Sequence, residues 1–144
     1  MSAAPLISVI TAAYKRPESL AHAMRSALSQ SFADFEYLVI GDCCEDNTED
    51  VVRGFDDPRI VWRNLPQNTG HQSGVNKAGL DMARGEYIAY LNQDDLWFPD
   101  HLAALIAPLR EHKLDLISSF YTLANKILYS VGNFGRSDSR SGPD

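Results

Sequence analysis

Four short apolar runs alternate along this chain with segments whose apolar residues recur at helical spacing. The runs cover residues 6–11, 35–41, 59–64 and 86–92. The first two runs are typical of strands that are buried on both faces of a sheet, and the other two are read as strands. Because each run is followed by a segment with helical periodicity, the sequence predicts an α/β fold with a mostly parallel sheet.

Glycine and proline residues predict where the helices begin and end. Gly85 stands where the third helix would have its C-cap glycine. Pro99 suits the first position of the fourth helix, with Phe98 as its N-cap. Pro108 lies further along that helix and is expected to kink or end it. Residues 114–119 are a candidate fifth strand.

Length and charge limit the class of protein. The chain has 144 residues, which suits one domain with a real core, and its formal net charge is −6. We expect a folded domain over residues 1–120 and an incomplete segment with a flexible tail over residues 121–144. An acidic chain argues against a nucleic-acid partner. It does not argue against a nucleotide bound together with a metal ion, since the ion supplies positive charge.

The cysteines and the first residues predict a cytoplasmic protein. Cys43 and Cys44 are the only cysteines, and neighbours in sequence rarely bridge each other, so no disulfide framework is expected. Residues 1–11 have a short apolar run without a basic flank, which predicts neither a signal peptide nor a membrane span. We expect no transmembrane segment, although the protein could still associate with the inner face of a membrane.

Asp94 and Asp95 are the most informative pair, because only Gln93 separates them from the fourth apolar run. Parallel sheets bind ligands at the carboxyl ends of their strands. The pair lies too far from Pro99 to cap the next helix well, so a solvated acidic turn and a metal site remain. Two carboxylates at a strand end suit Mg²⁺ or Mn²⁺, above all when a diphosphate completes the coordination.

Other strand-end loops carry candidate ligand-binding residues. Asp42 ends the second run, where an acidic residue often bonds the sugar or base of a nucleotide; a turn aspartate is the alternative. Tyr14 follows the first run and could stack on a base, or could be an ordinary loop tyrosine. His71 has no partner at metal-ligand spacing, so we expect a polar loop residue there.

The order of these loops resembles the nucleotide-sugar-binding half of family 2 glycosyltransferases with the GT-A fold. The resemblance covers about residues 5–120. It begins with ISVITAAYKRPESLAHAMRSALSQSFADFEYLVIGD and continues through EDNTEDVV, DPRI, QNTGHQSGVNKAGLDMARGEYIAYLNQDDLW and PDHL. The resemblance implies a Rossmann-like three-layer α/β/α fold and a metal-dependent, inverting transfer of sugar from a nucleoside diphosphate sugar, with a uridine diphosphate sugar as the expected donor.

The same resemblance implies roles for individual residues. Asp95 would be the main ligand of Mn²⁺ or Mg²⁺, and Asp94 would contact the ribose or the metal. Asp42 would hydrogen-bond the base. Nucleotide contacts are also implied for Ala13 with Tyr14 and for Asn76. The chain has Val75 where many family members have an arginine.

Members of this family continue into a second half that builds the acceptor site and supplies a general base. After Phe120 this chain offers only Asp138 and Asp144 as carboxylates, so no catalytic base is assigned and the acceptor is unknown. We expect these residues alone to bind donor, to transfer sugar negligibly and to form homodimers. The alternative is a non-catalytic nucleotide-binding or interaction module that keeps the fold.

Overall fold

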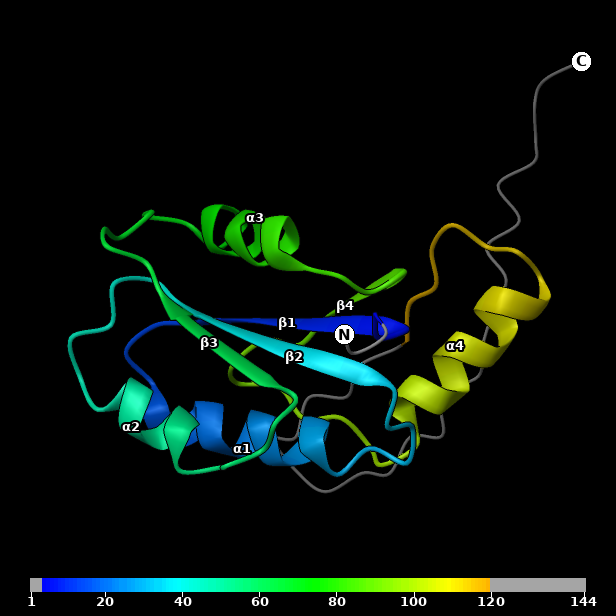
Figure 1. Ribbon diagram of the computed structural model, residues 1–144, viewed down its shortest axis with the longest axis horizontal. Coiled ribbons are helices and arrows are strands. Elements are labelled where there is room, and N and C mark those ends of the chain that lie inside the picture. Colours follow the sequence, from blue (N-terminus) through cyan, green and yellow to red (C-terminus); the bar gives the residue numbers. More distant parts are fainter. Residues whose placement is uncertain (1–3, 120–144) are drawn as a thin grey trace, which may run out of the picture. The chain divides into compact units, whose positions relative to one another are not determined.

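The computed structural model describes residues 4–119 (Figure 1). The elements follow in the order β1 (Ile7–Ala13), α1 (Pro17–Leu28), β2 (Phe35–Gly41), α2 (Thr48–Arg53), β3 (Ile60–Asn64), α3 (Gln72–Met82), β4 (Tyr87–Tyr90) and α4 (His101–Glu111). The chain divides into two compact units, Met1–Ala103 and Ala104–Asp144. The sheet lies in the first unit, and the predicted alternation of strands and helices is confirmed.

The four strands form one parallel sheet in the order β3-β2-β1-β4. β1 pairs with β2 from Ile7 opposite Phe35, and with β4 from Ile7 opposite Tyr87. Helix α3 covers one face of the sheet, and α1 and α2 cover the other (Figure 1). The predicted three-layer α/β/α fold is therefore confirmed. Because all strands run in the same direction, their carboxyl ends share one edge of the sheet.

The central strands are buried on both faces, as their continuous apolar sequences predict. Every residue of β2 is buried, and only one residue of β1 is partly exposed. On the α3 side, Val75 packs in a cluster with Ile10, Leu38 and Ile40. A Cβ added at Gly79 would lie 2.6 Å from Ile10 Cγ2. Glycine at this position therefore lets α3 approach β1 closely. Burial of each aliphatic side chain in this cluster stabilises the folded state by about 2 kcal/mol.

Helix α1 fixes the path of the chain after β4. Its apolar stripe, formed by Leu20, Ala23, Met24 and Ala27, is buried. Beyond its end, the buried side chain of Gln30 donates from Nε2 to the carbonyl of Phe98 at 2.7 Å. The backbone N–H of Trp97 donates to Ser26 Oγ at 3.2 Å. These bonds hold the segment that leads away from Asp94 and Asp95.

Gly85 does not cap α3, so that prediction is wrong. The helix ends at Met82, and its C-cap is Ala83 in an extended conformation. A Cβ added at Gly85 would lie 2.4 Å from the backbone nitrogen of Ser8. Gly85 is therefore needed for a close approach of its backbone to β1, two residues before β4 begins.

The start of the fourth helix also differs from the prediction. Pro99 and Asp100 form a turn, and α4 begins at His101. The predicted cap Phe98 accepts a bond from His101 N–H through its carbonyl oxygen. The side chain that caps this end belongs to Gln30, whose Oε1 accepts from Leu102 N–H at 2.9 Å. Sequence proximity suggested the wrong residue, because the cap comes from far along the chain.

Two further expectations concern the end of the described residues. Pro108 does not end α4, which continues to Glu111. Residues 114–119 form no strand. The predicted segment 121–144 lies outside the described residues, and the predicted domain boundary at residue 120 stays a prediction. Among residues 4–119 no helix is long and apolar enough to span a bilayer.

Candidate functional site

The carboxyl ends of β1, β2 and β4, together with the loops that follow them, carry five of the six predicted site residues. β1 lies between β2 and β4 in the sheet. β2 ends opposite Ala13, and β4 ends three residues earlier, opposite Ile10. With neighbouring strands about 4.8 Å apart and about 3.3 Å per residue, the ends of β2 and β4 are about 14 Å apart, on either side of β1. This is the point where the strand order reverses, which in open α/β sheets is the usual place for a ligand.

Asp42 is buried directly after β2, with 6% of its surface exposed. Its Oδ1 accepts a hydrogen bond from Thr69 N–H at 2.7 Å. Its backbone N–H donates to the carbonyl of Ala13 at 2.9 Å, so the predicted contacts Ala13 and Asp42 are bonded to each other. Among the described residues Oδ2 has no hydrogen-bond partner, yet no side-chain polar atom there is both buried and unsatisfied. Oδ2 is therefore not completely buried and can accept a bond from a ligand.

Tyr14 follows the end of β1, and 39% of its surface is exposed. The Nζ of Lys15 lies 4.9 Å from the centre of its ring. The pKa of Lys15 is raised, first by its contact with the Tyr14 side chain and then by the charges of nearby carboxylates. Lys15 has a φ of 51°, a left-handed conformation that is uncommon for a residue with a side chain. The chain therefore turns sharply just after the exposed ring.

Asp94 and Asp95 are exposed and have few partners. Oδ2 of Asp94 pairs with Arg16 Nη1 at 3.0 Å, and the two side chains are 53% and 61% exposed. Oδ2 of Asp95 accepts from Asn92 Nδ2 at 2.8 Å, and Asn92 Oδ1 accepts from Gln72 Nε2 at 2.6 Å. Exposed ion pairs contribute about 1 kcal/mol or less. A divalent cation can therefore displace Arg16 from Asp94 at little cost.

The acidic pair fits a divalent cation only as part of a shared site. Within residues 4–119, no group of three or more His, Cys, Asp or Glu side chains could hold a metal ion. Mg²⁺ and Mn²⁺ are often held by one or two carboxylates together with substrate phosphates and water. The donor set of Asp94 and Asp95 therefore suits an ion that arrives with, or is completed by, a diphosphate.

Asn76 and His71 belong to the α3 side of the site. Asn76 lies on α3 one turn after Gln72, the residue that bonds Asn92. Residues four apart share a face of a helix, but within residues 4–119 no hydrogen bond joins the side chain of Asn76 to the strand-end loops. His71, expected to be a polar loop residue, is the N-cap of α3. Its Nδ1 accepts from Gly74 N–H at 3.0 Å.

The two cysteines are free thiols, as expected. The Sγ of Cys43 lies 3.7 Å from the carbonyl oxygen of Pro66, and that of Cys44 lies 3.3 Å from the carbonyl oxygen of Ala13. Burial raises the pKa of the Cys44 thiol, which makes it a poor nucleophile at neutral pH. We therefore assign Cys43 and Cys44 a structural role in the loop that begins at Asp42.

Reasoning from sequence missed Gln93 and Arg16. The amide of Gln93 bonds both backbone groups of Tyr14, at 2.9 Å and 3.1 Å. Arg16 pairs with Asp94. Nothing in a single sequence indicates that a polar loop residue such as Gln93 bonds a backbone so far away along the chain. The only hint for Arg16 was its place two residues after Tyr14.

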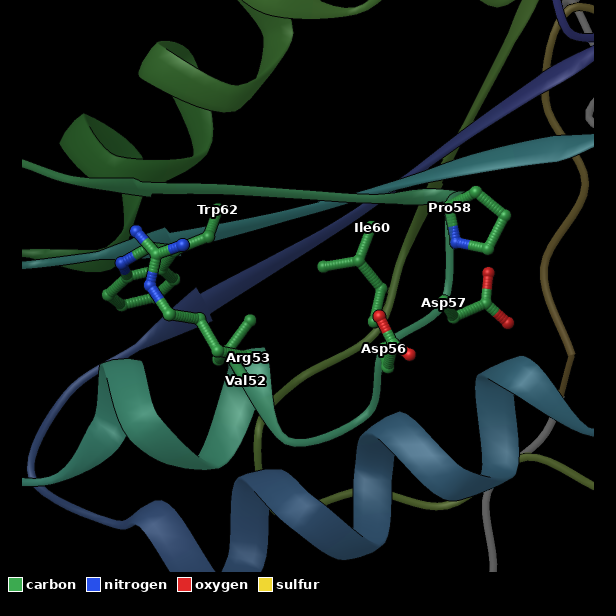
Figure 2. A pocket seen from close by; sticks show the side chains of 7 residues that line it. All are labelled: Val52, Arg53, Asp56, Asp57, Pro58, Ile60 and Trp62. Carbon is green, nitrogen blue, oxygen red and sulfur yellow. The ribbon is translucent and has the colours of Figure 1, made fainter.

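An open hollow of about 390 Å³ lies between α2 and the edge strand β3, and Figure 2 shows the side chains around it. It contains none of the predicted site residues. Two of its three charged side chains already have partners, since Arg53 pairs with Glu49 and Asp57 pairs with Arg59. We therefore place the candidate site at the strand ends and not in this hollow.

Comparison with known proteins identifies the family. The model of glycosyl transferase family 2 matches residues 8–129. The teichuronic acid biosynthesis protein TuaG of Bacillus subtilis is 33% identical over 121 residues, which cover 83% of this chain and 48% of TuaG. The β-1,3-glucosyltransferase WfaP of Escherichia coli is 29% identical over 120 residues, which cover 83% of this chain and 45% of WfaP. The chain belongs to glycosyl transferase family 2, and it spans about half the length of these relatives.

Solved structures agree with this assignment. TarS of S. aureus, residues 1–349, superposes with a TM-score of 0.71 at 25% identity, over 74% of this chain and 33% of that one. A complex of the same TarS fragment with UDP-GlcNAc gives a TM-score of 0.70 at 26% identity. The mannosyltransferase PcManGT of Pyrobaculum calidifontis, solved with GDP-Man and Mn²⁺, gives 0.65 at 23% identity over 75% of this chain and 33% of that one. The fold is that of the GT-A glycosyltransferases.

Proposed function

We propose that this chain forms the donor-binding part of a glycosyltransferase that uses a uridine diphosphate sugar together with Mn²⁺ or Mg²⁺. One observation carries the proposal: the loops after β1, β2 and β4 present Tyr14, Asp42 and the acidic pair at the same edge of the sheet, where hydrogen bonds join these strand ends and their loops. In support, TarS has been solved with UDP-GlcNAc, and the full name of WfaP includes UDP-Glc.

Asp42 and Tyr14 would hold the nucleoside. Oδ2 of Asp42 has no hydrogen-bond partner among the described residues and suits an N–H donor such as the ring imide of uracil, while Thr69 keeps Oδ1 in place. The exposed ring of Tyr14 offers a face for stacking, since aromatic pairs gain energy beyond simple burial. In this proposal the backbone at Ala13 supports the base from β1, and Asn76 lines the site from α3.

Asp95 and Asp94 would hold the cation. When bound, such an ion neutralises the diphosphate as it leaves the sugar. Asp94 gives up its pair with Arg16 for this purpose, and Asn92 keeps the carboxylate of Asp95 oriented. An inverting transfer also needs a base within hydrogen-bond reach of the acceptor hydroxyl. No residue of this chain is assigned to that step.

Thermal denaturation tests the donor site. Uridine diphosphate with Mn²⁺ is expected to raise the melting temperature, because a ligand at about 100 times its Kd stabilises the native state by about 2.7 kcal/mol. Uridine diphosphate with a chelator, or Mn²⁺ alone, is expected to shift it much less. An equal shift in the presence of chelator would contradict the role of the metal. If no nucleoside diphosphate shifts the melting temperature, the chain is an interaction module that keeps the fold.

Turnover and assembly are tested on the same sample. We propose that the chain alone binds donor but transfers sugar negligibly, that it forms homodimers, and that it acts in the cytoplasm at the inner face of a membrane. Released uridine diphosphate measures the transfer, and light scattering measures the mass. The apolar residues that led us to expect dimers, Phe120, Tyr121, Ile127 and Leu128, lie outside the described residues. Steady acceptor-dependent release by a monomer would contradict this part of the proposal.

A further inference from the structure

Gln93 joins the two loops to which the proposed function assigns the base and the metal. Its Oε1 accepts from the backbone N–H of Tyr14 at 2.9 Å, and its Nε2 donates to the backbone carbonyl of Tyr14 at 3.1 Å. The side-chain amide therefore pairs with one residue in the way that a neighbouring strand would. The bonded residues are 79 positions apart in sequence.

This contact lies where the backbone has left the sheet. β1 ends at Ala13, and its pairing with β4 ends at Ile10 opposite Tyr90. Tyr14 therefore has no strand beside it on the β4 side, and the Gln93 amide takes that place. The next residue, Lys15, has a left-handed φ of 51°. The two hydrogen bonds from Gln93 fix the backbone of Tyr14 immediately before this turn. They therefore also fix the direction in which the Tyr14 side chain leaves the backbone.

Gln93 is also the residue directly before the acidic pair. Its backbone position is thus set by the same turn that carries Asp94 and Asp95, while its side chain holds the loop of Tyr14. Asp94 adds a second connection to that loop through Arg16. This second connection is the one that a cation would break, and the Gln93 amide contacts need not change when an ion binds.

We propose that Gln93 is a positioning residue for the nucleotide. It holds the Tyr14 ring at a fixed place beside the metal-binding turn, so that the base and the diphosphate of one ligand meet both loops without prior rearrangement. This inference rests on the proposed function, because it concerns the same ligand. Gln93 itself need not touch the ligand, and its effect on affinity passes through Tyr14.

The test is a set of binding titrations with uridine diphosphate and Mn²⁺. Gln93→Met keeps the length of the side chain and removes both polar atoms. It is expected to weaken binding about tenfold, since two backbone hydrogen bonds that order the loop are lost. Gln67→Met is the matched control, because Gln67 is an exposed loop residue, and it is expected to leave the Kd unchanged. Equal affinity of Gln93→Met and the wild type would overturn the inference.

A double-mutant cycle separates positioning from general damage. In the background of Tyr14→Ala, the further change Gln93→Met is expected to alter the Kd less than about twofold, because the ring that Gln93 positions is gone. If Gln93→Met weakens binding equally in both backgrounds, Gln93 does not act through Tyr14 and the inference is wrong.

Hydrogen exchange tests the contact without any nucleotide. The amide of Tyr14 is expected to exchange about tenfold faster in Gln93→Met than in the wild type, while amides within β2 keep their rates. An unchanged rate at Tyr14 would overturn the inference. If instead the wild type fails to bind any nucleoside diphosphate, the proposed function fails, and the exchange rates still show whether Gln93 holds the loop. The two failures are therefore distinguishable.

Discussion

The amino ends of the parallel strands lie along one side of the sheet, here called the amino edge, and their carboxyl ends lie along the other, the carboxyl edge. The carboxylates at these two edges differ in burial and in the number of hydrogen-bond partners. At the amino edge, Glu36 in β2 has only 5% of its side chain exposed. Its Oε1 accepts from Ser8 Oγ and from Arg84 N–H, and its Oε2 accepts from Arg84 Nε at 2.8 Å. At the carboxyl edge, the side chain of Asp94 is half exposed and forms an ion pair with Arg16.

This difference teaches which carboxylates are structural and which are available to a ligand. Both oxygens of Glu36 are committed, and a buried carboxylate that lost these donors would be costly. Asp94 and Asp95 can change partners at the surface for about 1 kcal/mol or less. We therefore expect changes at the amino edge to affect stability, and changes at the carboxyl edge to affect binding.

Gly85→Ala is expected to have the largest effect. The added Cβ would lie 2.4 Å from the backbone nitrogen of Ser8, and backbone cannot rotate away as a side chain can. We expect a loss of about 3 kcal/mol in the free energy of unfolding, measured by urea denaturation. Gly54→Ala is the control, because its Cβ would lie 3.3 Å from the carbonyl of Asp50 at a φ of −65°. A similar loss in both variants would mean that the approach to Ser8 is not tight.

Asp95→Ala tests the opposite edge. We expect the affinity for uridine diphosphate in the presence of Mn²⁺ to fall at least about 100-fold, or about 2.7 kcal/mol, because the diphosphate loses its bridging cation. The melting temperature without ligand is expected to change little, since Asp95 is exposed. Calorimetric titration measures the affinity. Unchanged affinity would refute the metal role of Asp95 and leave Asp94 as the candidate.

Glu36→Gln sharpens the comparison without changing the size of the side chain. We expect a loss of about 2 kcal/mol in the free energy of unfolding, because an amide group would face the donors of Arg84 in a buried place. Glu49→Gln removes an exposed carboxylate that pairs with Arg53, and a much smaller loss is expected, because solvent screens exposed ion pairs. Equal losses would show that burial does not distinguish the two carboxylates.

The pH dependence of stability follows from the same carboxylate. Burial acts to raise the pKa of Glu36, but the bonds from Ser8 and Arg84 and the charge of Arg84 outweigh it and hold the pKa below the usual 4.5. A lowered native pKa contributes stability above pH 4.5, which is lost as the pH falls through that value and through the native pKa. The stability difference between wild type and Glu36→Gln should therefore shrink below pH 4.5. A difference that grows on acidification would contradict this sign.

Much of the fold could be predicted because each strand is marked by a pattern of apolar residues within its own short segment. The continuous apolar run of β2 gave Phe35–Gly41 to the residue. The predicted C-cap role of Gly85 and the predicted start of the fourth helix at Pro99 were wrong, because both residues are surrounded by residues that are far away in sequence. Gly85 is explained by Ser8, and the start of α4 by Gln30. A pattern within a few residues does not contain such contacts.

The candidate site was predictable to the same extent. Asp42, Asp94 and Asp95 follow apolar runs, so a parallel sheet places them at one edge whatever the details of the loops. The contacts that hold those loops, from Gln93 to Tyr14 and from Arg16 to Asp94, span 79 and 78 residues. They depend on the strand order and on rotamers, neither of which a single sequence shows. The binding roles of these residues stay predictions.

Paramagnetic broadening by Mn²⁺ tests most directly whether the carboxyl edge is the ligand-binding edge. β1 has seven residues, so the two edges are about 20 Å apart. With uridine diphosphate and Mn²⁺ bound, we expect the amide signals of Tyr14, Asp42 and Asp95 to vanish, while those of Glu36 and Gly85 stay sharp. Mg²⁺ in place of Mn²⁺ should restore the lost signals. Broadening centred on Glu36 and Gly85, or spread evenly over the chain, would contradict a cation held at the ends of β1 and β4.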